Sequence, residues 1–273
     1  MAGKLVFTAV NLEPRIGTEI ETDRETLLSG SHAQEIRHLL EERGVLVFRN
    51  IGLDDDEQLA FAKTIGQVVP QGDKGLYKIT LDQTQSDTAD LLRGTFCWHF
   101  DGAVQEIPRA SMLSPRRISA SGGETEFANV YAAYDDLPES EKTAIDKLRV
   151  VHVRETLHRT IFPNPTEAQL ERWRSTAPKT RPLVWTHKSG RKSLLLGLTA
   201  TSIEGMDAGE GRALIDRLQD LATQPQFVYR HEWKMGDLLI WDNTGVLHRA
   251  LPYSFESGRM LHRTTLVGEE APA

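Results

Sequence analysis

The chain has 273 residues, of which 39% are hydrophobic and 26% are charged, a balance typical of a globular protein and not of a disordered or fibrous one. Its 32 lysine and arginine residues stand against 39 aspartate and glutamate residues, and the resulting net charge of −7 disfavours nucleic-acid binding, because such proteins are usually basic. The single cysteine, Cys97, excludes an intramolecular disulfide and a zinc site built from several cysteines.

The N-terminal stretch MAGKLVFTAVNLEPR has too short an apolar segment for a secretory signal peptide. No run in the sequence approaches the roughly 18 apolar residues of a membrane span. We therefore expect a cytoplasmic protein in a reducing setting.

The first predicted elements are two helices with a strand between them. Residues 32–43 place apolar side chains at helical spacing, Gly44 predicts the end of this helix, and Val45 to Phe48 predict a strand. A second helix is predicted from the acidic start at Asp54 to a stop at Gly66.

After the second helix the sequence becomes mostly β. Short β-rich runs separated by Gly, Pro and Asp turns predict strands at 95–101, 109–115, 124–130, 181–187, 192–197, 227–233, 237–243 and 259–267. Two helical patches, 139–151 and 210–223, interrupt them. So many short strands favour a sandwich or barrel with attached helices, which can reach this size as one domain.

The segment 158–181 is polar, contains prolines and lies between predicted strands. Long irregular insertions of this kind are often lids or binding loops. A solvated surface excursion is the alternative, and the sequence does not choose between them.

The stretch FCWHFDG contains a His-x-Asp pair, His99 and Asp101. On a strand, residues i and i+2 point to the same face, so the two side chains can converge on one ion. A facial iron site needs two imidazoles and one carboxylate, with positions left open for oxygen and substrate. The pair alone is short enough to occur by chance, and an ordinary strand with two polar side chains is the alternative.

A histidine far along the chain can complete such a site. His248 follows the apolar strand and turn of GDLLIWDNTGVLHRALPY, and Arg259 and Arg263 lie four residues apart, on one face of the last predicted strand. A guanidinium matches a carboxylate in a two-point contact, so two arginines beside a metal ligand suggest an acidic cosubstrate. A surface strand with alternating basic residues is the alternative.

Several ordered motifs carry a family resemblance. WHFDG, SGGETEFANVYAAYDDLP, RPLVWTHKSGRKSLL, GDLLIWDNTGVLHRA and GRMLHRTTLV occur in the order found in the TauD/TfdA family of iron(II)- and 2-oxoglutarate-dependent dioxygenases. The N-terminal RGVLVFRNIGLDDDEQLAFAKTIGQV also resembles the opening of that family, so the resemblance covers most of the chain.

The resemblance implies roles for named residues. His99, Asp101 and His248 match the iron ligands of the family, and Thr125 and Arg259 match the residues that hold the distal carboxylate of 2-oxoglutarate. Arg263 matches a further arginine near the other end of 2-oxoglutarate and the substrate.

The resemblance also implies a single domain over residues 1–273, with a mainly β fold: a double-stranded β-helix, or jelly roll, with flanking helices. The implied reaction consumes O₂ and 2-oxoglutarate, releases succinate and CO₂, and hydroxylates a small, anionic organic substrate, with subsequent cleavage where the carbon bears a heteroatom. No catalytic residue beyond the metal ligands is expected. Family relatives are often oligomers, so a homo-oligomer is possible, whereas no nucleic-acid or membrane partner is expected.

Some positions depart from the family pattern and point to the substrate pocket. Phe100 stands where a small polar residue is usual, and Gln71 lies near the region in which the taurine enzyme carries a sulfonate-contacting histidine. Taurine is therefore a poor candidate substrate. With Arg263, these residues form the predicted substrate contacts, but they do not identify the compound.

The sequence leaves two other functional classes open. One is a catalytically silent jelly-roll protein that binds or senses 2-oxoglutarate or iron, and the other is a zinc hydrolase, because two histidines and a carboxylate also suit zinc. The intact ligand set with Arg259 disfavours the first, and Thr125 with Arg259 would have no task in the second.

Overall fold

The computed structural model describes residues 7–72, 74–86 and 89–272. In this part of the chain the larger sheet has the strand order β1-β2-β3-β13-β5-β15-β4, and a smaller sheet has the order β12-β6-β14. The strands of the larger sheet are β1 (Phe7–Asn11), β2 (Thr18–Thr22), β3 (Val45–Phe48), β13 (Leu238–Asp242), β5 (Ala110–Arg117), β15 (Met260–Leu266) and β4 (Tyr77–Ile79). Those of the smaller sheet are β12 (Val228–His231), β6 (Thr125–Asn129) and β14 (Val246–Ala250).

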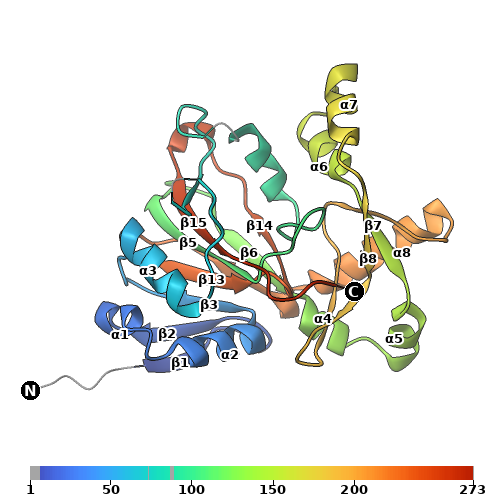
Figure 1. Ribbon diagram of the computed structural model, residues 1–273. Coiled ribbons are helices and arrows are strands. Elements are labelled where there is room, and N and C mark those ends of the chain that lie inside the picture. Colours follow the sequence, from blue (N-terminus) through green and yellow to red (C-terminus); the bar gives the residue numbers. More distant parts are fainter. Residues whose placement is uncertain (1–6, 73, 87–88, 273) are drawn as a thin grey trace, which may run out of the picture.

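The two sheets form the predicted jelly roll (Figure 1). One hydrophobic cluster joins them, with Leu113 and Trp241 contributed by the larger sheet and Phe127 and Val246 by the smaller one. Strand alternation explains this core, because every second residue of β13 faces it while Leu238 and Ile240 face the other way. The two sheets therefore enclose one hydrophobic interior. A polar side chain can be buried there only if it binds another polar group or a ligand.

Helices cover the outer face of the larger sheet. α1 (Arg24–Leu28), α2 (Ala33–Arg43) and α3 (Asp55–Ile65) pack on it through a second hydrophobic cluster. The predicted helix ends are confirmed: Gly44 follows α2, and Asp54 caps α3 in a reciprocal capping box with Glu57. The helices hold the sheet from outside and leave its inner face to the site.

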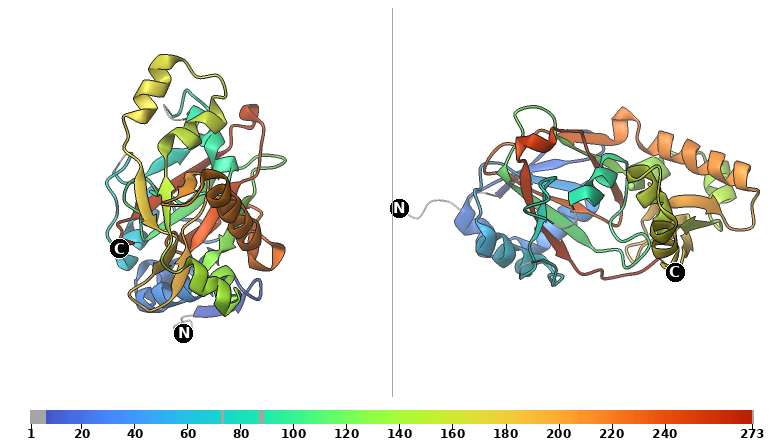
Figure 2. Two further views of the ribbon diagram at one scale, coloured as in Figure 1. Left: turned by 90° about the vertical axis from the view of Figure 1, so that its right-hand side faces the viewer. Right: turned by 90° about the horizontal axis from the view of Figure 1, so that it is seen from above.

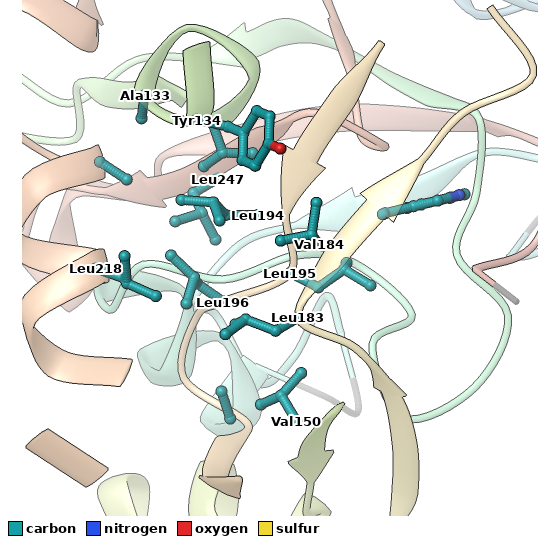
Figure 3. Packing of buried hydrophobic residues seen from close by; sticks show 14 of the residues in the cluster. Ala133, Tyr134, Val150, Leu183, Val184, Leu194, Leu195, Leu196, Leu218 and Leu247 are labelled. Carbon is teal, nitrogen blue, oxygen red and sulfur yellow. The ribbon is translucent and has the colours of Figure 1, made fainter. Parts of the chain in front are cut away.

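A third cluster covers the outer face of the smaller sheet (Figure 3). There Leu247 of β14 packs with leucines 194–196 and with Leu218. The elements on this side are α4 (Val130–Asp135), α5 (Glu139–Ile145), β7 (Arg149–His152), β8 (Lys179–Pro182), β9 (Val184–Thr186), β10 (Lys192–Leu194), β11 (Ala200–Ile203), α8 (Ala208–Ala222) and η2 (Pro225–Phe227). The short turn η3 (Phe255–Ser257) lies elsewhere, before β15, where the Phe255 ring contacts Arg93.

Three sequence predictions about local structure are wrong. The helical patch predicted at 139–151 ends early, since α5 stops at Ile145 and the strand β7 follows. The strand predicted at 95–101 is not formed: the 3₁₀ helix η1 (Ala89–Phe96) occupies its start, and His99 makes only an isolated β-bridge. The segment 158–181 is not irregular, since it holds the second half of α6 (Arg154–Ile161), all of α7 (Glu167–Arg174) and the start of β8. Figures 1 and 2 show α6 and α7 as an arm that projects from the body of the molecule.

The arm has a small core of its own. The His158 ring stacks on Trp173 with centroids 4.9 Å apart, and a capping box at Thr166 starts α7. α6 also contacts η1, which precedes His99. Across the described ranges, none of the helices combines the length and apolar character needed to cross a membrane.

Candidate metal centre

The structure brings together the three side chains predicted as metal ligands. His99 and Asp101 follow η1, and His248 lies in β14. The main chains of His99 and His248 exchange two hydrogen bonds, of 3.1 and 3.0 Å, and their imidazole centroids lie 4.1 Å apart. One candidate ligand atom from each of the three residues lies within 4.8 Å of the other two. After small side-chain adjustments, the three atoms can coordinate a single metal ion with metal–ligand bonds of about 2 Å.

The protonation states of the three side chains suit a divalent cation. His99 Nδ1 donates to the Cys97 carbonyl at 2.8 Å, which leaves the Nε2 lone pair free, and burial lowers the pKa of both His99 and His248. Burial raises the pKa of Asp101, but Arg263 and the two imidazoles outweigh this effect and bring it to about 2. Two neutral imidazoles and one carboxylate form the donor set of a facial iron(II) site, so the residues fit that metal.

Three side chains fix Asp101. The Asn243 side chain accepts a hydrogen bond from Asp101 N at 3.2 Å and donates one to Asp101 O at 3.0 Å. Ser111 Oγ lies 3.4 Å from Asp101 Oδ2, and Arg263 Nη1 lies 3.3 Å from both carboxylate oxygens. Gly102 follows with a φ of +75°, and a Cβ there would lie 2.0 Å from the carbonyl oxygen of Glu106. The carboxylate is therefore set in place by its own neighbours.

A cavity of about 50 Å³ adjoins the cluster. His99 and His248 line one part of it, and Thr125 and Arg259 line another. Its remaining walls are mainly apolar or aromatic: Ile79, Leu113, Trp241, Ala250, Tyr253 and Leu261, with Thr95 and Arg263. The structure thus places the predicted 2-oxoglutarate residues and two of the three predicted metal ligands around one space.

Arg259 is a buried cation without a carboxylate partner. Its exposed fraction is 3%, and burial lowers its pKa. Its guanidinium donates to the Gly123 carbonyl at 2.8 Å and lies over the Tyr253 ring at 4.6 Å, but no described acidic side chain lies within ion-pair distance. A buried guanidinium without a counter-ion indicates a site for an anion.

A larger cavity, of about 780 Å³, lies on the other side of Asp101. Asp101 and Arg263 line it together with the loop 102–108 and the segment 265–268, and Gln71 and Lys179 supply further polar groups. Arg263 lines both cavities, so it lies between them. Phe100, in contrast, is buried in the hydrophobic cluster of Figure 3, so its contact with a substrate stays a prediction.

Sequence reasoning missed several residues of the site. Asn243 and Ser111 lie in predicted strands, and nothing in the sequence indicates that they reach Asp101 from the neighbouring segment. Lys179 lies at the end of the segment that was predicted to be irregular. Arg181, two residues later, donates to the Ala103 carbonyl at 2.7 Å and so fixes the loop that lines the larger cavity.

Comparison with known proteins gives a consistent result. Residues 8–265 match the family described as "Taurine catabolism dioxygenase TauD, TfdA family". The alpha-ketoglutarate-dependent 2,4-dichlorophenoxyacetate dioxygenase of Burkholderia sp. (strain RASC) is 38% identical, over 88% of this chain and 87% of that protein. The alpha-ketoglutarate-dependent sulfate ester dioxygenase of Pseudomonas putida is 34% identical, over 93% of this chain and 87% of that protein.

A solved structure extends the comparison to the fold. The crystal structure of AAD-2 in complex with Mn(II) and N-oxalylglycine has a TM-score of 0.84 and 30% sequence identity. The alignment covers 98% of this chain and 100% of the other. The similarity therefore includes the whole jelly roll and its flanking helices.

Proposed function

Because the chain belongs to the TauD/TfdA family and is a 2-oxoglutarate-dependent dioxygenase, we propose that it oxidises an aryloxyalkanoate, a small carboxylate with an aryl ether on its α-carbon. The observation that carries the proposal is the cluster of His99, Asp101 and His248 beside the unpaired buried cation Arg259. The proposal assigns this activity to one domain spanning residues 1–273.

The metal would be iron(II), held by His99, Asp101 and His248. When bound, iron(II) supplies the activation of O₂ that couples decarboxylation of 2-oxoglutarate to oxidation of a substrate C–H bond. The hydrogen bond from His99 to the Cys97 carbonyl orients one imidazole, and Asn243 fixes the main chain of Asp101. These contacts keep the ligands in place before the metal arrives.

Arg259 and Thr125 would bind the distal carboxylate of 2-oxoglutarate in the smaller cavity. The Arg259 guanidinium offers charge and paired N–H donors, and the Thr125 hydroxyl offers one more donor. The apolar walls exclude water, which strengthens these interactions. Arg263 contacts Asp101 and lies between the cavities, where it can also face an anionic substrate.

The larger cavity would hold the primary substrate, with its carboxylate toward Arg263 and its aryl group toward the loop 102–108. Hydroxylation of the carbon that bears the ether oxygen gives a hemiacetal. This product collapses to a phenol and a 2-oxo acid, so the C–O bond breaks after the oxidation. The curated relatives named for phenoxyacetate and phenoxypropionate substrates support this substrate class.

The test is a substrate panel with succinate release as the readout. Phenoxyacetate and both enantiomers of 2-phenoxypropionate are compared with hexyl sulfate and taurine, in the presence of iron(II), 2-oxoglutarate and air. We expect stoichiometric succinate and phenol from at least one phenoxy acid. Succinate coupled only to the sulfate ester or to taurine would overturn the substrate class.

Asp101→Ala provides the test of the site itself. We expect this variant to lose succinate formation and the weak visible charge-transfer band that appears when iron(II) and 2-oxoglutarate are added without oxygen. Asp146→Ala is the matched control, because Asp146 pairs with Lys192 on the surface, outside both cavities. Wild-type turnover in Asp101→Ala would refute the ligand assignment.

A further inference from the structure

We propose that Trp233 is a positioning residue that fixes the direction of the Thr125 hydroxyl, so that this hydroxyl donates to the distal carboxylate of 2-oxoglutarate. The inference rests on the proposed function, which places that carboxylate between Thr125 and Arg259. Trp233 belongs neither to the metal cluster nor to the lining of the larger cavity.

The contact that carries the inference is one buried hydrogen bond. Thr125 lies in β6 with an exposed fraction of 4%, and its Oγ1 accepts a hydrogen bond from Trp233 Nε1 at 2.9 Å. An indole N–H can only donate, so it occupies a lone pair of the hydroxyl oxygen and cannot accept its hydrogen. Without this donor, no hydrogen bond would fix the orientation of the Thr125 hydroxyl.

The hydroxyl hydrogen of Thr125 is therefore left for another group. Among the described residues no acceptor is placed to receive it, although the oxygen itself has a partner. The same side chain lines the small cavity with Arg259, whose guanidinium donates to the Gly123 carbonyl but has no acidic side chain within ion-pair distance among the described residues. The Thr125 hydroxyl and the Arg259 guanidinium therefore line one space, and a carboxylate, with two acceptor oxygens, can accept a hydrogen bond from each.

Trp233 is itself held by a buried polar network. Its ring meets the His231 ring edge to face, with centroids 4.4 Å apart. His231 lies 3.0 Å from the Tyr229 hydroxyl and 3.2 Å from Asp237 Oδ2. Asp237 also accepts a hydrogen bond from Lys234 N at 3.0 Å, which closes the turn directly after Trp233. The network gives the indole one orientation, in which its N–H meets Thr125.

The experiment is a double-mutant cycle on 2-oxoglutarate binding. Calorimetric titration of 2-oxoglutarate into the Mn(II)-loaded protein is carried out for wild type, Trp233→Phe, Thr125→Val and the double variant. Phe keeps the ring against His231 and removes only the donor. We expect Trp233→Phe to weaken binding about threefold to tenfold, and to have less than about a twofold effect once Thr125 is Val.

A truncated ligand separates positioning from general damage. 2-Oxovalerate keeps the keto acid end and the chain length of 2-oxoglutarate but lacks the distal carboxylate, so Trp233→Phe should bind it as wild type does. In turnover, KM for 2-oxoglutarate should rise while kcat and KM for the primary substrate stay within about twofold of wild type. Trp185→Phe, at a buried tryptophan outside both cavities, is the matched control and should change none of these quantities.

The outcomes are distinct. Unchanged 2-oxoglutarate binding in Trp233→Phe, an undiminished effect in the Thr125→Val background, or an equal loss with 2-oxovalerate would each overturn the inference. If Thr125→Val and an Arg259 variant also bind 2-oxoglutarate normally, the proposed cosubstrate site fails as well. If Trp233→Phe does not fold, incorporation of β-(3-benzothienyl)alanine at position 233, which keeps the bicyclic shape without the N–H, gives the same test.

Discussion

Replacing Arg259 with Met should separate cosubstrate binding from fold stability. In the structure this guanidinium is 3% exposed and contacts a carbonyl and an aromatic ring, with no acidic side chain in range among the described residues. Gly123, at a φ of +83°, allows the close approach, since a Cβ there would lie 2.7 Å from Arg259 Nε. The side chain is thus packed as a binding group and not as half of an ion pair.

The magnitude follows from these contacts. Arg259→Met loses a hydrogen bond from a charged donor, about 2 kcal/mol, and a cation–π contact of about 1 kcal/mol. It also removes the desolvation penalty of an unpaired buried ion, which is several kcal/mol. The free energy of unfolding without ligands should therefore stay within about 1 kcal/mol of wild type. Loss of one partner of a buried ion pair would instead cost about 3 to 5 kcal/mol.

Ligand-linked stabilisation should change in the opposite way. At a 2-oxoglutarate concentration of about 100 times the wild-type Kd, the Mn(II)-loaded wild type should gain about 2.7 kcal/mol. If Arg259→Met weakens binding about 100-fold, the same concentration gives the variant only about 0.4 kcal/mol.

The assay is urea unfolding of the Mn(II)-loaded proteins with and without 2-oxoglutarate, followed by circular dichroism. Arg43→Met is the matched control, because Arg43 is part-buried and bonds carbonyls of Glu13, Pro14 and Gly17 far from the cavities. This control should lose stability and keep the full ligand effect. A loss above about 3 kcal/mol in ligand-free Arg259→Met, or full stabilisation of that variant by 2-oxoglutarate, would refute the reasoning.

Three further outcomes are expected. Asn243→Ala should weaken Mn(II) binding about tenfold, measured by calorimetry, because Asp101 loses both main-chain contacts, whereas unchanged affinity would contradict this role. Gly102→Ala should lower the unfolding free energy by about 2 to 4 kcal/mol in urea, since its Cβ would collide with a carbonyl. Burial, with Arg181, lowers the pKa of His152 from 6.5 to about 4, so the unfolded chain binds more protons and stability falls by up to about 3 kcal/mol as pH drops from 6.5 to 4. His152→Gln should flatten that part of the curve, and an unchanged slope would argue against it.

The sequence predicted the site side chains better than the backbone that carries them. His99 and Asp101 were placed together by strand alternation, yet the structure uses an isolated bridge and a turn at Gly102. Alternation does hold for Arg259 and Arg263, which both line the small cavity from the region of β15. The sequence could predict that these side chains lie together because the ordered family motifs contain them. The backbone around His99 could not be predicted, because it depends on packing against β14.

The remaining gaps have physical causes. The proline-bearing segment 158–181 lacks a long amphipathic pattern, and its short helices are stabilised by contacts such as the stack of His158 on Trp173. The capping box at Thr166 was a readable signal for α7 that the prediction did not use. The contact of Asn243 with Asp101 spans 243 − 101 = 142 positions, and its partner is set by tertiary packing that no local pattern encodes.

The paired main-chain hydrogen bonds between His99 and His248 have a consequence for metal exchange. These residues are 248 − 99 = 149 positions apart, and main-chain hydrogen bonds, not side-chain ligands, close that loop. The loss of conformational entropy that brings the two imidazoles together therefore occurs on folding, and it does not weaken metal binding. The metal-free protein should therefore stay folded and exchange divalent ions reversibly. The metal content after purification then depends on the ions to which the protein was exposed, and it is no measure of folding.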